Sequence, residues 1–319
     1  MSEKFHVSAN PHVRSKVTTA SIMRDVLIAL LPAAAFGVYN FGVPALIRII
    51  VGIVCSVAFE GLYEYFMHKK LTIRDCSAAV TGLLIALNIP STLPIFMEIV
   101  GCAFAIIIVK QLFGGLGQNF MNPALAARCF MLIGYTQAMT TFAFDGVTGP
   151  TPLAIIKPGS DYAGQGVDLL NMFIGRTGGV IGETSVICLL IGAAYLLVRK
   201  VISIKIPAAY IGTFAILIFL FAPGHHFDGM FLAQQICGGG LMLGAFFMAT
   251  DYVTSPNSPM GQVVFGIILG ILTFLFRMYG SNAEGVSYAI IFTNLLVPLI
   301  ERLTVPKPFG YRKPVKEAK

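Results

Sequence analysis

Long apolar stretches separated by polar segments recur along the whole chain. A helix needs about 17 to 25 predominantly apolar residues to cross a hydrocarbon core of about 30 Å, and most of these stretches have that length. One stretch, 76–90, is shorter, which is typical of a broken or tilted helix. The pattern predicts about ten transmembrane helices, at 24–41, 43–66, 76–90, 94–113, 122–140, 180–198, 206–222, 232–250, 260–278 and 285–301.

The composition also favours a membrane protein. Hydrophobic residues make up 56% of the chain and charged residues only 12%. Soluble domains usually contain about 25% charged residues, so this chain lacks the polar surface of a soluble enzyme. The first long apolar stretch begins only near Arg24, and no small-residue cleavage site precedes it. We therefore expect this stretch to be a retained helix and not a signal peptide.

The basic residues are distributed unevenly among the polar segments. The net charge is +7, and most of the 22 lysines and arginines lie in alternate segments. Lysine and arginine are enriched in cytoplasmic loops of membrane proteins. This bias predicts an even number of helices with both termini in the cytoplasm. It also explains the net charge without a nucleic-acid partner.

One long polar loop divides the chain into two apolar halves. We expect a cytoplasmic N-terminal segment, a first five-helix membrane repeat, an extracytoplasmic loop, a second five-helix repeat and a cytoplasmic basic tail. Their respective bounds are 1–23, 24–140, 141–179, 180–301 and 302–319. Loops as long as 141–179 tend to be functional or disordered.

The second half repeats the order of features in the first. Gly82 lies in an apolar segment followed by a proline-containing break, an apolar run and an aromatic–glycine pair at 113–114. Gly244 begins the same order of features, which ends at 279–280. The predicted topology makes these segments run in opposite directions, so the halves would be inverted repeats, as in many transport proteins. Chance similarity between glycine-rich apolar helices is the alternative.

The long loop contains the most distinctive polar stretch outside the helices, Asp145-Gly-Val-Thr-Gly-Pro-Thr-Pro-Leu153. Taken alone, such a string of turn-forming residues predicts a solvated turn. The triplet 238–240 (Gly-Gly-Gly) lies within the predicted helix 232–250, where we expect close helix packing and not a phosphate-binding loop.

The stretch 145–153 resembles the flavin-attachment motif of a known family. That family contains the D subunits of the Rnf complex and the B subunits of the sodium-translocating NADH:quinone reductase. The resemblance extends over essentially the whole chain and includes 8–14 (SANPHVR), 110–119 (KQLFGGLGQN) with 122–124 (NPA), 244–251 (GAFFMATD) and 309–313 (FGYRK). The short chain and its tail favour the Rnf D subunit over the longer quinone-reductase subunit.

The resemblance implies covalent FMN, joined to Thr151 through a phosphoester. Asp145, Thr148 and Gly149 would be recognised by an FAD:protein FMN transferase, which is needed because a threonine hydroxyl is a poor nucleophile by itself. Pro150 stands where the family usually has alanine. It stiffens the segment and puts the efficiency of modification in question. The resemblance also leaves open a second, noncovalent riboflavin or FMN.

The resemblance further implies an all-α, urea-channel-like membrane subunit of an ion-translocating ferredoxin:NAD+ oxidoreductase, not catalytic alone, that relays electrons. Its partners would be the Rnf subunits A, B, C, E and G, the transferase and the lipid bilayer. It would lie in a bacterial or archaeal cytoplasmic membrane with the flavin loop outside. Sodium and proton both remain candidates for the coupling ion. A passive channel, a structural anchor and the B subunit of the quinone reductase are the alternatives.

Several charged residues fall within or near the predicted spans. Arg128 is the deepest, and we expect it to be paired or to lie near a flavin or phosphate. Glu60, Glu64, Glu98 and Asp251 are also candidates for pairing or for lining a water-filled path. For Glu60, Glu64 and Asp251, snorkelling to the membrane interface or a subunit contact is the simpler interpretation. No group of residues has the spacing of a metal site, and adjacent histidines in an outer loop lack a third ligand.

Overall fold

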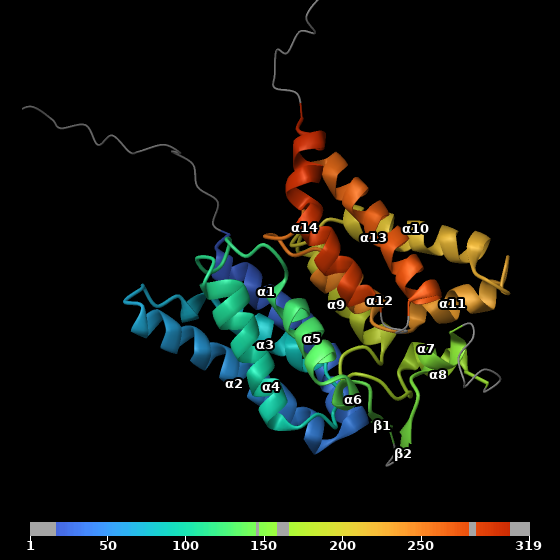
Figure 1. The fold of residues 1–319 in the computed structure, drawn as a ribbon, viewed down its shortest axis with the longest axis horizontal. Coiled ribbons are helices and arrows are strands. Elements are labelled where there is room, and N and C mark those ends of the chain that lie inside the picture. Colours follow the sequence, from blue (N-terminus) through green and yellow to red (C-terminus); the bar gives the residue numbers. More distant parts are fainter. Residues whose placement is uncertain (1–16, 145–146, 158–165, 281–284, 307–319) are drawn as a thin grey trace, which may run out of the picture.

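The computed structural model describes residues 17–144, 147–157, 166–280 and 285–306, and this part of the chain is mainly helical (Figure 1). The first half contains α1 (Thr19–Phe41), α2 (Val43–Phe66), the 3-10 turn η1 (Ile73–Asp75), α3 (Ser77–Leu87), α4 (Ile95–Ala103), the π-helical continuation η2 (Phe104–Gln111), α5 (Pro123–Gly134) and α6 (Thr136–Met139). The loop region contains β1 (Phe142–Phe144), β2 (Val147–Gly149), α7 (Pro152–Ile156) and α8 (Leu169–Ile174). The second half contains α9 (Val186–Val198), α10 (Lys205–Phe221), α11 (Gly229–Cys237), α12 (Leu241–Leu243), the π-helical segment η3 (Gly244–Met248), α13 (Pro259–Tyr279) and α14 (Val286–Thr304).

Fewer helices are long enough to cross a membrane than the sequence predicts. In the described part, four helices are long and apolar enough, namely α1, α2, α13 and α14, and a fifth span results if α11 and α12–η3 count together. The helices α3, α5, α9 and α10 are apolar but shorter. At about 1.5 Å per residue, α3 covers only about half of the hydrocarbon core. The helical, multi-span interpretation is therefore confirmed, whereas ten complete spans are not.

The shortness of α3 has local causes at both ends. At its start, the carboxylate of Asp75 accepts a hydrogen bond from the Ser77 N–H (2.8 Å), and Cys76 has a positive φ of 64°. At its end, the side chain of Asn88 donates to the Leu84 carbonyl (2.6 Å). Prolines 90 and 94 follow and disfavour further helix. The prediction of a short, broken element at 76–90 is confirmed.

The glycine triplet 238–240 interrupts the predicted helix 232–250. Gly239 and Gly240 have φ values of 64° and 66°, in the region that favours glycine. The pair α11 and α12–η3 is bent by 63° at this point. The prediction that the triplet lies inside a continuous helix is therefore wrong, because two successive left-handed residues cannot continue a right-handed helix.

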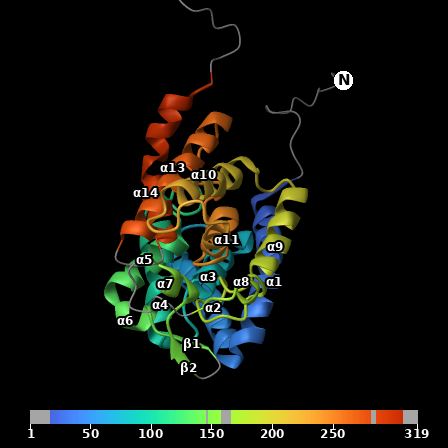
Figure 2. The same ribbon diagram turned by 90° about the vertical axis from the view of Figure 1, so that its right-hand side faces the viewer.

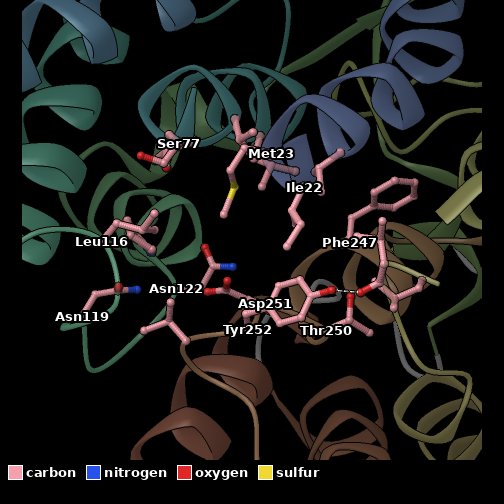
Figure 3. A pocket seen from close by; sticks show the side chains of 18 of the residues that line it. Ile22, Met23, Ser77, Leu116, Asn119, Asn122, Phe247, Thr250, Asp251 and Tyr252 are labelled. Atoms are coloured by element: carbon pink, nitrogen blue, oxygen red, sulfur yellow. Dashed lines mark hydrogen bonds between the residues drawn. The ribbon is translucent and has the colours of Figure 1, made fainter. Parts of the chain in front are cut away.

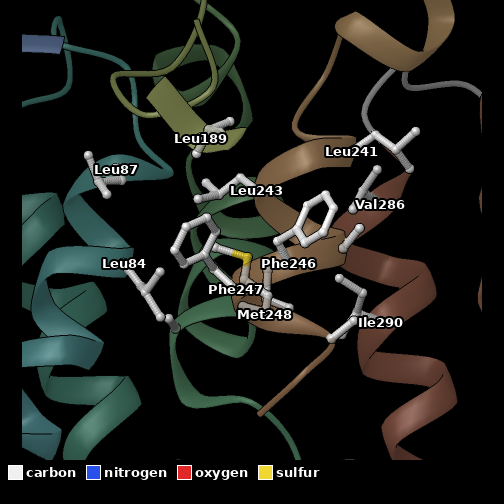
Figure 4. Packing of buried hydrophobic residues seen from close by; sticks show 14 of the residues in the cluster. Leu84, Leu87, Leu189, Leu241, Leu243, Phe246, Phe247, Met248, Val286 and Ile290 are labelled. Carbon is white, nitrogen blue, oxygen red and sulfur yellow. The ribbon is translucent and has the colours of Figure 1, made fainter. Parts of the chain in front are cut away.

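The two halves meet through a buried apolar cluster (Figure 4). Leu84 and Leu87 of α3 approach from one side, and Val286 and Ile290 of α14 approach from the other. The segment η3 lies between them with its aromatic side chains. Helix α1 packs against α9, and α5 packs against α14, so each of these contacts joins the halves.

The start of α1 and the end of α14 lie at one end of the molecule, and the hairpin β1–β2 lies at the opposite end (Figures 1 and 2). The strands pair antiparallel, with Phe142 opposite Gly149. This small hairpin is a departure from a purely helical fold. It stands where the sequence predicts a loop, and it leads directly into α7.

Replacing Gly82 by alanine should destabilise the first half, because helices α2 and α3 touch at this residue. A Cβ at Gly82 would lie 2.2 Å from the Gly52 carbonyl oxygen. The helices would have to separate, and overpacking of this kind costs about 1–3 kcal/mol. The measurement is the midpoint of thermal unfolding in detergent. Gly212→Ala in α10 is the matched control, since a Cβ there meets nothing within 4 Å. Equal midpoints for the two variants would contradict the prediction.

Candidate functional site

Thr151 is held at the start of α7, immediately after the hairpin. Its Oγ1 accepts a hydrogen bond from the Ala154 N–H (3.3 Å), and the residue is only 7% exposed. Pro152 occupies the first position of the helix, where its fixed φ is suited to helix entry. The hydroxyl is therefore buried and oriented, which differs from the freely solvated turn that the residue types alone predict.

A pocket opens beside Thr151 at the hairpin end of the molecule. Its volume is about 360 Å³, open space at its mouth included. Its lining consists largely of small residues from three segments: Thr151–Leu153, Thr177–Val180 with Glu183 and Thr184, and Cys237–Gly239, joined by Met172. Four glycines form part of this lining. A Cβ at Gly179 would meet no atom within 4 Å, whereas a Cβ at Gly239 would lie 2.2 Å from Leu153 Cδ2. The pocket therefore exists because the chain bends at 238–240 and approaches the segment before α9.

The remaining predicted motif residues are less well defined. Gly149 ends β2 and is exposed, and a Cβ there would meet no atom within 4 Å. Thr148 pairs with Ala143 in the hairpin, and its side chain lies outside the described part of the chain. Asp145 also lies outside the described residues. The roles of these residues in recognition by a transferase stay predictions.

Arg277 stabilises the bend at 238–240 through hydrogen bonds to its backbone. Its Nη2 donates to the carbonyls of Gly238 (2.9 Å) and Gly239 (2.8 Å), and its Nη1 donates to the Gln235 carbonyl (2.5 Å). The side chain is 1% exposed and lies over the Phe214 ring. The sequence places Arg277 at the end of a helix and gives no sign of this contact, because the bend that it stabilises is itself not predicted.

Arg128 connects the pocket to the broken helix α3. Its Nη1 lies 2.5 Å from Glu183 Oε1 and donates to Asn88 Oδ1 (2.6 Å). Glu183 lines the Thr151 pocket, and Asn88 contacts the sulfur of Met248 (3.9 Å). The structure thus shows a buried ion pair at this position. A role for Arg128 beside a flavin stays a prediction.

Near Thr151, Lys157 ends α7 and donates through Nζ to the Gly280 carbonyl. Partial burial lowers the pKa of Lys157 from its ordinary value, because desolvation disfavours the charged amine. The loop thus places a basic group next to Gly280, at the end of α13.

A second, larger cavity lies where α1, α3 and α5 begin and α9 ends, away from the hairpin. It encloses about 750 Å³, open space at its mouth included. Figure 3 shows side chains that line it. Ile22, Met23 and Phe247 supply apolar walls, and Asn119 and Asp251 supply polar groups. The Nδ2 of Asn119 donates to the Met121 carbonyl (3.1 Å), but its buried Oδ1 has no hydrogen-bond partner in the described part. The cavity therefore combines apolar walls with a few polar side chains.

Three glutamates of the first half have buried carboxylates that do not lie at the surface of the chain. Glu60 and Glu98 are 0% exposed and Glu64 is 2% exposed. Lys110 forms an ion pair with Glu60 (2.5 Å), and Arg48 lies 4.0 Å from Glu98. The simpler interpretation of Glu60 and Glu64 as interfacial groups is therefore wrong, and intrachain pairing replaces it. Among the described residues, no group of three or more histidine, cysteine, aspartate or glutamate side chains could hold a metal.

The sequence matches the NQR2, RnfD, RnfE family over residues 6–310. It is 46% identical to the D subunit of the Na(+)-translocating ferredoxin:NAD(+) oxidoreductase complex of Acetobacterium woodii, with 98% of each chain covered. It is 42% identical to the D subunit of the proton-translocating ferredoxin:NAD(+) oxidoreductase complex of Clostridium ljungdahlii, with 97% of each chain covered. Identity to the D subunit of the ion-translocating oxidoreductase complex of Stutzerimonas stutzeri is 36%, over 96% of this chain and 97% of that relative.

Proposed function

The chain belongs to the NQR2, RnfD, RnfE family, and from this premise we propose that it is the D subunit of an ion-translocating ferredoxin:NAD+ oxidoreductase. The observation that carries the proposal is similarity along the full length of relatives that bear this name. The buried Thr151 hydroxyl beside its pocket supports it. The B subunit of the quinone reductase is a less favoured alternative, because these relatives are named as D subunits.

Within this role, Thr151 would carry FMN through a phosphoester. The fit rests on a hydroxyl fixed by the Ala154 N–H and on the pocket next to it, in which Gly179 borders open space. The backbone at 178–179 and 238–239 would line the bound group, and Arg277 would keep the second of these segments in place. When bound, a flavin supplies electron transfer, while the protein determines its position and electrostatic surroundings.

The cavity away from the hairpin suits a noncovalent riboflavin or FMN. A flavin ring has two apolar faces and a polar edge that both donates and accepts hydrogen bonds. Phe247 and Met23 would contact the faces, and polar side chains of the lining, such as Asn119 and Asp251, would bond the edge.

We also propose that the two halves are inverted five-helix repeats with a urea-channel-like arrangement. In the first half, Arg128 of α5 donates to Asn88 at the end of α3. In the second half, Asn294 of α14, with its amide oriented to satisfy its neighbours, donates to the Thr254 carbonyl (3.1 Å) just beyond η3. In each half, a side chain of the last long helix thus forms a hydrogen bond with a residue at or just beyond the end of a broken helical segment. This correspondence supports the repeat.

We further propose that the subunit lies in a bacterial or archaeal cytoplasmic membrane, with its termini in the cytoplasm and Thr151 outside. The positions of the helix ends and of the hairpin at opposite ends of the molecule support this orientation, as does the charge bias of the loops. Many large apolar side chains are exposed, which suits contact with lipid and with Rnf subunits A, B, C, E and G. An FAD:protein FMN transferase would be a transient partner at the loop.

The proposed function predicts that membranes lacking this chain lose NAD+ reduction by reduced ferredoxin. They should also lose the accompanying uptake of sodium ions or protons into inverted vesicles. Restoring the chain from a plasmid should restore both activities. Full activity without the chain would contradict the proposal. A purely structural anchor would instead require that membranes with Thr151→Ala still transfer electrons, and a passive channel would require solute flux through the isolated chain in liposomes.

A further inference from the structure

A row of polar side chains runs inside the first half along one face of α2. Ser56, Glu60 and Glu64 follow one another at intervals of four residues, which places them on the same side of the helix. All three are buried, and Arg48 continues the row two turns earlier. Helix α2 packs against α3, α4 and η2. At about 1.5 Å per residue, the row extends about 24 Å, most of the thickness of a hydrocarbon core.

The end of the row near η2 is a continuous chain of hydrogen bonds that reaches the surface. Glu60 Oε1 accepts from Gln111 Nε2 (2.9 Å) and pairs with Lys110 Nζ (2.5 Å). The same Gln111 nitrogen lies 3.4 Å from Glu64 Oε1. Glu64 in turn accepts from the N–H of Thr72 (2.9 Å), which is exposed. Lys110 also lines the large cavity, so the row and the cavity share this residue.

The other end of the row is formed by Glu98 of α4. Its carboxylate is 0% exposed and lies 4.0 Å from Arg48 Nε. A Cβ placed on Gly52 would lie 3.1 Å from Glu98 Oε1, so this carboxylate stands at the level of Gly52. Gly52 is one helical turn from Ser56, and Ser56 is one turn from Glu60. Polar groups from Glu98 to Glu64 therefore recur about every 6 Å along α2.

Four buried atoms of this row have no hydrogen-bond partner in the described part of the chain. They are both oxygens of Glu98, Oε2 of Glu60 and Nε of Arg48, whereas the Ser56 hydroxyl lies beside the Cys102 thiol. A buried polar group without a partner costs about 1–3 kcal/mol, and more if it is charged. Buried water molecules normally satisfy such groups. Water molecules between these groups would satisfy them and link each group to the next.

We propose that this row is a path for protons between α2, α3 and α4–η2. A proton would pass from Glu98 through bridging water and Ser56 to Glu60. From Glu60 it would pass through a further water molecule to Glu64, and from Glu64 to the exposed hydroxyl of Thr72, which bonds it. The Gln111 amide, which donates to both Glu60 and Glu64, would position these carboxylates and carry no proton. Each step breaks one O–H bond and forms another, so no electrons are exchanged and no further reactant is needed. The path adds ion movement to the proposed electron-relay role. The observations that support the path are those of the buried row alone and do not depend on that role.

The surroundings of the carboxylates favour protons over a metal cation. Hard metal cations take about six oxygen ligands. Here Arg48 and Lys110 each place a positive charge beside one of the carboxylates, where such a cation would have to bind. At about 4 Å, two like charges near a protein surface repel each other by about 4 kcal/mol. A neighbouring positive charge also disfavours proton uptake by a carboxylate. The protonated carboxylate is neutral, however, so no extra charge stays beside Arg48 or Lys110 and no shell of ligands is needed.

The test uses the purified full chain in liposomes that contain a pH-sensitive dye, with a potassium diffusion potential as the driving force. We expect proton flux above that of protein-free liposomes. Glu98→Gln should lower the flux by about tenfold or more, since it removes a proton carrier. Ser56→Ala should also lower it. This variant leaves no charge unpaired, so it keeps the test decisive if Glu98→Gln fails to fold.

Glu301→Gln is the control, because Glu301 lies near the end of α14 and bonds Asn257, outside the row. Its flux should equal that of the wild type. The proposal is overturned if the wild-type flux matches protein-free liposomes, or if Glu98→Gln and Ser56→Ala both conduct like the wild type. A flux of radioactive sodium that Glu98→Gln blocks, without proton flux, would also overturn it and would assign the row to sodium.

Discussion

Thr151→Ala is expected to remove covalent flavin completely from the subunit. The phosphoester needs the threonine hydroxyl, and alanine offers no oxygen in its place. Intact mass of the chain, purified with the transferase co-expressed, should lose the addition that corresponds to FMN less water. The band in a denaturing gel should also become dark under ultraviolet light. A noncovalent flavin in the cavity near Asn119 should survive the substitution and be released by acid extraction.

Two matched variants make this expectation specific. Thr151→Ser keeps a hydroxyl at the same place and should keep at least part of the covalent flavin. Thr177→Ala removes a hydroxyl from the lining of the same pocket and should keep all of it. An unchanged mass addition in Thr151→Ala would rule out this residue as the attachment point. Because Thr151 is only 7% exposed, we expect the transferase to act on an opened or incompletely packed loop.

Arg128→Leu is expected to destabilise the folded chain by about 3–5 kcal/mol, the usual effect of removing one partner of a buried ion pair. The change would leave the carboxylate of Glu183, 6% exposed in its side chain, without the guanidinium 2.5 Å away. Asn88 would lose its bond to the same guanidinium. The readout is thermal unfolding in detergent, together with the yield of monodisperse protein.

Comparison with an exposed ion pair distinguishes the effect of burial on stability from the effect of losing one charge. Arg199 pairs with Asp25 at 3.2 Å but is 56% exposed in its side chain. Arg199→Leu should therefore cost only about 0–1 kcal/mol. The double variant Arg128→Leu with Glu183→Leu should recover much of the loss, because no buried charge remains alone. If Arg128→Leu were as mild as Arg199→Leu, the pair would have no structural importance.

The positions of the helices could be predicted from the sequence because apolar length is a strong signal in a membrane protein. Every predicted apolar stretch contains a helix, and the early end of α3 follows from Asn88 and the prolines after it. The bend at 238–240 could not be predicted, because glycine is equally suited to close helix packing and to a left-handed turn. Its conformation depends on Arg277, which is distant in sequence.

The candidate site was predictable only in part. Resemblance to a family points to Thr151, but not to its burial or to the pocket, which need segments far apart in the sequence to meet. The pairing of Lys110 with Glu60 depends on the π-helical segment η2. In that segment Lys110 and Gln111 both reach Glu60, although neighbouring residues of a regular helix point about 100° apart. Hydrophobic periodicity contains no signal for such a local change.

The placement of the Thr151 pocket beside the hairpin and of the large cavity away from it has an electrical consequence. In the proposed orientation, an electron passing between flavins at these two sites would cross part of the voltage of an energised membrane. Such a transfer involves about 2.3 kcal/mol per electron for each 100 mV crossed. The resting voltage would then favour one direction of electron flow and oppose the other. The subunit would act as an electrogenic element, whichever ion the complex carries.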